Sequence, residues 1–200
     1  MKKLYGSIAI VVTLCLGVLP ARPDFDINKV SAALIADHKY DLVQEEIEFY
    51  AMHRKYTQGV TLQELGLTEQ TLNEKLIAVF NQTRQDFKED RVELVVVKDG
   101  DELLGSVFFC RVEDESGSYI RIRHLNSPHI DQFEIFAKIV EKMLPLIHQR
   151  FPFQRQIFCV TRTAIQVYKD ALKAAGFTES DFLPEECDRN SQVAYVFLYN

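Results

Sequence analysis

The sequence lacks the features that mark several protein classes. It has only 8 glycines and 6 prolines among 200 residues, and its formal net charge is -6. An acidic chain without a clustered lysine and arginine stripe argues against nucleic acid as a partner, because a surface that follows phosphates is normally basic. A hydrophobic content of 47% excludes intrinsic disorder, and the low glycine and proline content excludes a collagen-like repeat. The chain is therefore expected to fold as one domain of ordinary size.

Cysteine is scarce as well, with only 4 in the chain. Cys15 lies near the amino terminus, and Cys110, Cys159 and Cys187 are far apart. This pattern does not indicate a disulfide framework, and Cys110 and Cys159 fall in apolar runs where buried free thiols are usual. The sequence also has no P-loop, dinucleotide-binding fingerprint or nucleophile elbow, and its histidines do not have the spacing of a metal site.

No apolar run is long enough for an ordinary transmembrane helix. Residues 8–19 are nearly all apolar, but Pro20 ends the run well short of the roughly 20 residues that a bilayer requires. A basic start, this short run and Ala21 are typical of a signal peptide over residues 1–21, which would make the protein exported, either periplasmic or secreted. The alternatives are an uncleaved anchor that associates with a membrane through residues 8–19, a lipoprotein signal at Cys15, or a buried helix.

Residues 22–90 are expected to form a helical amino-terminal part of the domain. The helical pattern breaks near Lys39 and at residues 57–66. Residues 61–64 have the form of a capping box, which marks the start of a helix. The clearest apolar stripe at helical spacing predicts a helix over residues 69–87.

After residue 91 the hydrophobic period changes to that of strands. Residues 92–97 are apolar apart from Glu93 and rich in β-branched side chains, and residues 103–111 read as a second strand that contains Val107, Phe108 and Phe109. Between them, residues 98–101 read Lys-Asp-Gly-Asp, which is a strong turn signal. The segment therefore predicts a β-hairpin.

The remaining elements alternate between strand and helix. Ser127 and Pro128 are typical of a helix N-terminus, Pro145 is expected to kink or shorten that helix, and Gly176 is expected to cap the next one. The predicted elements are a strand over 119–125, a helix over 128–148, a strand over 156–160, a helix over 163–175 and a strand over 193–199. This order predicts an α/β (α+β) domain with a mixed, largely antiparallel central sheet flanked by helices. The 128–148 helix is expected to be a parallel crossover.

The order of elements over residues 91–200 resembles the GNAT superfamily of N-acetyltransferases. The hairpin from Glu93 to Gly105 resembles the second and third strands of that family, and the long helix follows a third strand as it does there. The run from Thr161 to Tyr168, followed by Gly176-Phe177, is similar to the family's strand-end Asn, helix Ala and Tyr, and closing Gly-Phe. The resemblance implies transfer of an acyl group from acetyl-CoA or another acyl-CoA to an amine of a small molecule or protein.

The resemblance also implies roles for single residues. Tyr168 takes the position of the general acid when the motif is anchored on Thr161, whereas anchoring on Gly176 would place Leu172 there. His124 is the candidate base, because it ends a strand and histidine has an ordinary pKa of about 6.5. The alternatives are a core tyrosine and a hydrogen-bonded strand-end histidine. The cofactor-binding residues are expected to be Leu125, Asn126, Ser127, Thr161 and Thr163, and no metal ligand is predicted.

The loop before the long helix departs from the family's pattern. Residues 125–134 contain no glycine, and Pro128 lacks an N–H group. Asp131 and Glu134 bring negative charge to the place where the family binds the pyrophosphate of CoA. The alternative function is therefore an exported, non-catalytic GNAT-like binding module that has lost the pyrophosphate loop.

Arg121 and Arg123 form a basic face on the predicted 119–125 strand. They are candidates for binding an anionic substrate or the phosphates of CoA. The alternative is a solvated face whose arginines pair with nearby acidic residues.

Overall fold

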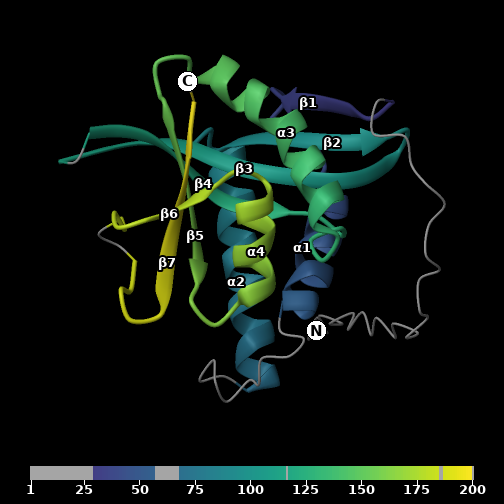
Figure 1. Ribbon diagram of the computed structural model, residues 1–200. Coiled ribbons are helices and arrows are strands. Elements are labelled where there is room, and N and C mark those ends of the chain that lie inside the picture. Colours follow the sequence, from purple (N-terminus) through teal and green to yellow (C-terminus); the bar gives the residue numbers. More distant parts are fainter. Residues whose placement is uncertain (1–28, 57–67, 116, 185–186, 200) are drawn as a thin grey trace, which may run out of the picture.

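The computed structural model describes residues 29–56, 68–115, 117–184 and 187–199, which Figure 1 draws as helices and strands. The helices are α1 (Val43–Tyr56), α2 (Glu69–Lys88), α3 (Phe133–Arg150) and α4 (Gln166–Ala174). The strands are β1 (Ser31–Ile35), β2 (Glu93–Asp99), β3 (Glu102–Asp114), β4 (Gly117–Asn126), β5 (Gln156–Arg162), β6 (Thr178–Ser180) and β7 (Gln192–Leu198). The predicted signal peptide and the capping box at 61–64 lie outside the described residues. Among the described helices, none has the length and apolar character needed to span a bilayer.

The strands form one seven-stranded sheet in the order β1-β2-β3-β4-β5-β7-β6. Every pair of neighbours is antiparallel except β4 and β5, which run parallel. The chain passes from β4 to β5 through α3, so this helix is the crossover that a parallel pair requires. The predicted mixed, largely antiparallel sheet is confirmed.

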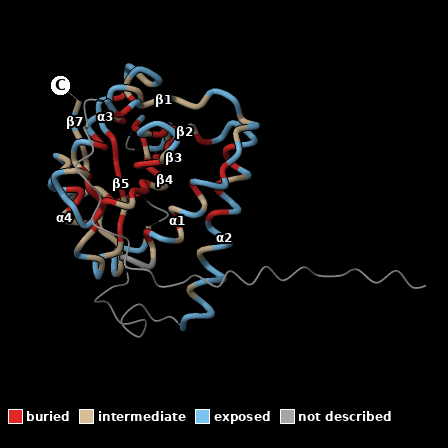
Figure 2. Tube along the Cα trace, turned by 90° about the vertical axis from the view of Figure 1, so that its right-hand side faces the viewer, coloured by how far each residue is buried: buried red, intermediate tan, exposed pale blue. Residues whose placement is uncertain are grey.

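The helices cover both faces of the sheet. α3 and α4 lie on one face and α1 and α2 on the other, as Figure 1 shows from the front and Figure 2 from the side. The apolar cluster under α3 and α4 includes Phe109 and Phe136, whereas the cluster under α1 and α2 includes Phe80 and Phe108. Phe108 and Phe109 are neighbours on β3 and face opposite ways, because side chains alternate along a strand.

In the second half of the chain, the predicted hairpin, the two helices that follow it and the end of α4 at Gly176 are confirmed. Gly100 occupies the hairpin turn with a φ of 59°. Gly176 follows α4 with a φ of 86°, and its N–H group donates to the carbonyl of Lys173. The next N–H, that of Phe177, donates to the carbonyl of Leu172, which completes a Schellman motif. These signals are local, so the sequence pattern was sufficient to predict them.

Gly105 allows β3 to pass closely beneath α3. A Cβ atom at this position would lie 2.8 Å from Cγ2 of Ile139 and 3.1 Å from the carbonyl oxygen of Asn126. A larger residue would therefore push α3 away from the sheet or displace the end of β4. The close approach fixes the loop that joins β4 to α3.

The amino-terminal part is less helical than expected. Residues Ser31–Ile35 form an edge strand, β1, that pairs antiparallel with β2, although their pattern predicts a helix. The short β6 was also not predicted; it pairs with β7 at the other edge of the sheet. Both are short edge strands whose single neighbour is distant along the chain, so tertiary pairing rather than local preference determines them.

Two predictions about α3 are wrong. Ser127 does not cap the helix, which begins at Phe133 after Gln132. The Ser127 hydroxyl instead donates to the carbonyl of Leu104 at 2.8 Å, and this contact keeps the intervening residues as a loop. Pro145 does not shorten the helix, which continues to Arg150. Pro145 is exposed, so the missing backbone hydrogen bond lies on the solvent side.

A β-bulge at Arg123 changes which face the end of β4 presents. His124 pairs with Phe108 and Ile122 pairs with Phe109, so Arg123 has no partner on β3. Ile122 belongs to the cluster under α3 and α4, whereas the His124 ring packs against Phe108 at a centroid distance of 6.4 Å. The extra residue therefore turns His124 toward α1 and α2.

Candidate active site

The parallel strands β4 and β5 stay together for only part of their length. They pair at Ile120 with Ile157, Arg121 with Phe158 and Ile122 with Cys159, and not beyond. β4 nevertheless continues to Asn126 and β5 to Arg162. Residues 123–126 of β4 and 160–162 of β5 are therefore not paired with each other. We call this place the strand opening. It lies at the carboxyl ends of two parallel strands, where α/β folds commonly bind ligands.

Tyr168 lies at the closed end of the strand opening, on the face covered by α3 and α4. This buried residue is in the first turn of α4, and its hydroxyl is 3.3 Å from Sγ of Cys159, the last β5 residue that pairs with β4. Burial raises the pKa of the Cys159 thiol to about 12, so it is a neutral group and not a nucleophile. Leu172 is fully buried in the core. The fold therefore brings Tyr168, and not Leu172, to the strand opening.

A pocket of 340 Å³ lies beside the strand opening, on the opposite face of the sheet; we call it the α2 pocket. Its walls are Val79, Gln82 and Thr83 of α2, Arg121, Ile122, Arg123 and His124 of β4, Val160 of β5, and Gln192 of β7. Among the described residues, two guanidinium groups and no acidic side chain line it. Sequence reasoning identified the arginines but missed α2 and Gln192, because no local motif connects them to β4.

His124 forms part of the wall of the α2 pocket and is partly buried. Its Nε2 is 2.7 Å from Oγ1 of Thr83, and the Thr83 hydroxyl donates to the carbonyl of Val79 at 3.1 Å. Because the Thr83 hydroxyl proton is used in that bond, Nε2 of His124 carries a proton and donates to Oγ1 of Thr83. Burial, aided by the nearby His53 and Arg123, lowers the pKa of His124 to about 3. An imidazole in this state accepts a proton poorly, and the bulge separates it from Tyr168 by the thickness of the sheet.

Three amides of the loop between β4 and α3 are already bonded, two within the loop and one to α1. The N–H of Ser127 points to Sδ of Met52 at 3.3 Å, and the N–H of His129 donates to the Ser127 hydroxyl at 3.2 Å. The N–H of Gln132 donates to the carbonyl of His129 at 2.9 Å, and Pro128 has no N–H group. These amides are not available to hold a pyrophosphate.

The other two residues predicted in this loop are also buried. Leu125 belongs to the apolar cluster under α3 and α4. Nδ2 of Asn126 donates to the hydroxyl of Ser106 at 3.4 Å, while its Oδ1 is buried without a hydrogen-bond partner among the described residues. The structure thus places Leu125 and Asn126 at the strand opening as supporting residues.

Thr161 and Thr163 lie at the end of β5. Thr161 is buried and pairs with Val193 of β7, within hydrogen-bonded sheet. Thr163 is exposed, and its N–H donates to the carbonyl of Ser191 at 2.9 Å. Both residues therefore border the β5 side of the strand opening.

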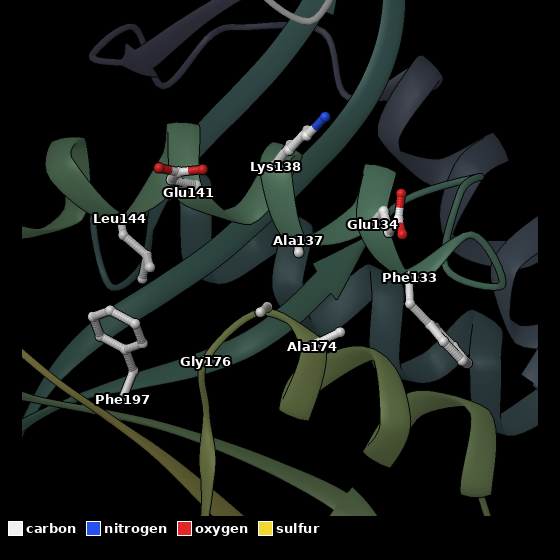
Figure 3. Close-up of a pocket in the computed structure, with 10 residues that line it drawn as sticks. Phe133, Glu134, Ala137, Lys138, Glu141, Leu144, Ala174, Gly176 and Phe197 are labelled. Atoms are coloured by element: carbon white, nitrogen blue, oxygen red, sulfur yellow. The ribbon is translucent and has the colours of Figure 1, made fainter.

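A second hollow of 540 Å³ runs along the outside of α3, between that helix, the end of α4 and β7. Figure 3 shows Glu134, Lys138 and Glu141 along α3, with Gly176 and Phe197 across from them. Two carboxylates and one ammonium give this groove no excess of positive charge. Glu134 is in the first turn of α3, and Asp131 is exposed just before it. The loop and the groove thus place carboxylates near the N-terminus of α3.

Comparison with known proteins identifies the fold. No protein-family model matches the sequence, and no curated protein matches it. Among solved structures, a PaiA N-acetyltransferase from Thermoplasma acidophilum in complex with coenzyme A is similar, with a TM-score of 0.61 at 8% identity, covering 85% of this chain and 99% of that one. The chain has the GNAT acetyltransferase fold.

Two further structures with the GNAT fold agree. A GNAT family acetyltransferase from Streptococcus agalactiae has a TM-score of 0.59 at 10% identity, covering 86% of this chain and 96% of that one. An acetyltransferase from Thermus thermophilus has a TM-score of 0.55 at 14% identity, covering 85% and 97%. The likeness extends beyond residues 91–200, so the amino-terminal elements β1, α1 and α2 belong to the same fold.

Proposed function

We propose that the protein is an N-acyltransferase that brings an acyl thioester and an amine together at the strand opening. The observation that carries this proposal is the end of β4–β5 pairing at Ile122 and Cys159, with the Tyr168 hydroxyl beside Cys159. The α2 pocket lies on the other face at the same place. The two reactants would therefore approach the strand opening from opposite sides of the sheet.

Acyl-CoA is the proposed donor, held mainly by the end that carries the thioester. The strand opening offers unpaired strand edges and the Tyr168 hydroxyl, whereas in the loop the amides of Ser127, His129 and Gln132 are already bonded and the first turn of α3 carries a carboxylate. When bound, the cofactor would supply an activated acyl group. We expect its affinity to be low, because the loop contributes little.

The chain's own residues divide the remaining work. Tyr168 holds a proton at the closed end of the strand opening, where a leaving thiolate would need one. His124 is assigned as a positioning residue, which fixes Thr83 in the wall of the α2 pocket through their 2.7 Å contact. The amine is expected to lose its proton to water in the α2 pocket rather than to His124.

Release of CoA thiol in the presence of acetyl-CoA and a panel of amines tests the proposal. We expect slow turnover by the full chain and a fall of roughly 100-fold or more in kcat for Tyr168→Phe, since proton transfer contributes about that much. Tyr199→Phe is the matched control, because Tyr199 stacks on His148 at 4.1 Å, away from the strand opening. A Tyr168→Phe protein with unchanged kcat would remove the acid role.

One observation favours a second function. The internally bonded loop amides fit the alternative of an exported, non-catalytic binding module, with the signal peptide of residues 1–21 directing it out of the cytoplasm. This alternative predicts that acetyl-CoA does not bind and that no amine gives thiol release. Detection of mature protein beginning at Arg22 outside the cytoplasm would support the export, and retention of Met1 would support an anchor.

A further inference from the structure

We infer that the α2 pocket binds the carboxylate of the acceptor, so that the substrate is an amine of about amino-acid size that carries a carboxylate. This inference deepens the proposed function and rests on it for the reaction. The binding site itself stands on separate observations, namely the charge, the shape and the position of the pocket.

The charge of the α2 pocket is opposite to that of the whole chain. The protein carries a net charge of -6, yet Arg121 and Arg123 are the charged side chains that line this pocket among the residues the structure describes. Asp86 lies one turn farther along α2, but Arg91 holds it with hydrogen bonds of 2.6 Å and 3.0 Å. Arg91 therefore holds Asp86 by hydrogen bonds, whereas Arg123 acts on this carboxylate only through space, which helps to lower the pKa of Asp86.

Arg123 owes its position to the bulge. As the extra residue of β4 it is exposed at the pocket rim, and among the residues that the structure describes it has no hydrogen bond or ion pair. An exposed arginine that makes no hydrogen bond to a described protein carboxylate keeps its N–H groups for a ligand carboxylate.

Arg121 supplies the second guanidinium from deeper in the pocket. It is only partly exposed, and its Nη2 is 3.6 Å from Sγ of Cys187. A guanidinium binds a carboxylate through two parallel N–H···O bonds, and partial burial strengthens such a pair relative to one on the surface. Arg121 and Arg123 are two residues apart on one strand and can approach one carboxylate from two directions.

The rest of the lining favours a small carboxylate over a phosphate. Phosphate sites in proteins usually use backbone N–H groups at a helix N-terminus, but α2 contributes residues 79–83 from its interior, where the amides are bonded within the helix. Val79 and Val160 add apolar wall, and Gln192 adds an amide. A volume of 340 Å³ is at the lower end of small-molecule sites, which suits a compact ligand.

Calorimetric titration of glutarate into the full chain tests the site without any need for turnover. Glutaramide is the neutral control of nearly equal size, and inorganic phosphate is the competing anion. We expect saturable binding of glutarate, no binding of glutaramide, and phosphate binding at least 10-fold weaker than glutarate. Arg123→Gln should weaken glutarate binding roughly 10-fold or more, as expected for loss of a charged hydrogen bond.

Arg111→Gln is the matched control variant. Arg111 is on the neighbouring strand β3, bonded to Ser118 and paired with Glu113, and should leave glutarate binding unchanged. Equal binding of glutarate and glutaramide, unchanged binding by Arg123→Gln, or tighter binding of phosphate would each overturn the assignment. Because the titration involves no acetyl-CoA, glutarate binding without acyl transfer would refute the proposed function alone, and absent binding alongside acyl transfer would refute the pocket alone.

Discussion

The strand opening and the β4–α3 loop lie next to each other, yet they differ in how their polar groups are used. At the strand opening, the edges of β4 and β5 and the Tyr168 hydroxyl border a pocket. In the loop, Ser127 and Pro128 leave few amides for a ligand, and exposed Asp131 and Glu134 add negative charge. Sheet pairing thus determines the geometry of the strand opening, whereas the sequence of the loop determines how many of its amides are already bonded.

The largest expected effect is a pH dependence of the free energy of unfolding that comes from the strand-opening side. It arises because His124 and the neighbouring His53 lose most of their contact with water on folding. Burial lowers the pKa of His124 to about 3 and that of His53 to about 4. Both groups bind protons more readily in the unfolded chain, so stability is complete above pH 6.5 and is lost as the pH falls toward these values. Between pH 7.5 and 5 the loss should be roughly 2 kcal/mol for each group.

Urea unfolding at pH 7.5, 6 and 5 checks this prediction in the wild type and in His124→Gln. Glu45 works in the opposite direction, because burial raises the pKa of its carboxyl group. The comparison of the two proteins is therefore decisive. His124→Gln should reduce the pH dependence by about half, and an identical dependence in both proteins would contradict a buried neutral His124.

Ser127→Ala should show that the loop serves the fold rather than a ligand. The substitution leaves the carbonyl of Leu104 and the N–H of His129 without their buried partner, which should cost about 1 to 3 kcal/mol in the free energy of unfolding. Affinity for acetyl-CoA should stay within a factor of about two. A large loss of affinity with normal stability would restore Ser127 as a cofactor ligand.

Glu134→Gln should have the smallest effect. Removing a carboxylate from the first turn of α3 should raise acetyl-CoA affinity by about 2- to 5-fold, because it lessens repulsion of the diphosphate. The same change should lower stability by up to about 1 kcal/mol, since the carboxylate favours the helix N-terminus. Glu74→Gln, on the exposed face of α2, is the control for both measurements.

The elements that local signals determine could be predicted from the sequence. The 93–114 hairpin and the end of α4 at Gly176 depend on turn and cap residues that act within a few positions. The edge strand β1 could not be predicted, because its Ala and Leu residues also suit a helix and only pairing with β2 makes it a strand. Secondary structure at such positions is decided by distant parts of the chain.

Single candidate residues could be proposed from the sequence, but their arrangement could not. Tyr168 was expected near the end of β5, and the structure places its hydroxyl against Cys159. The relation of His124 to Tyr168 depends on the bulge at Arg123, which turns His124 to the other face and has no clear mark in the sequence. The contribution of α2 to the pocket is likewise set by packing between segments about 40 residues apart.

Parallel calorimetric titrations of acetyl-CoA and acetyl-pantetheine into the full chain test the central claim most directly, because the two ligands share the thioester and differ in the diphosphate. The account predicts that both bind and that their affinities agree within about 3-fold, since the strand opening supplies the contacts and the loop does not. Binding of acetyl-CoA 100-fold tighter than acetyl-pantetheine would contradict the account of the loop, and absence of binding by both would contradict the account of the strand opening.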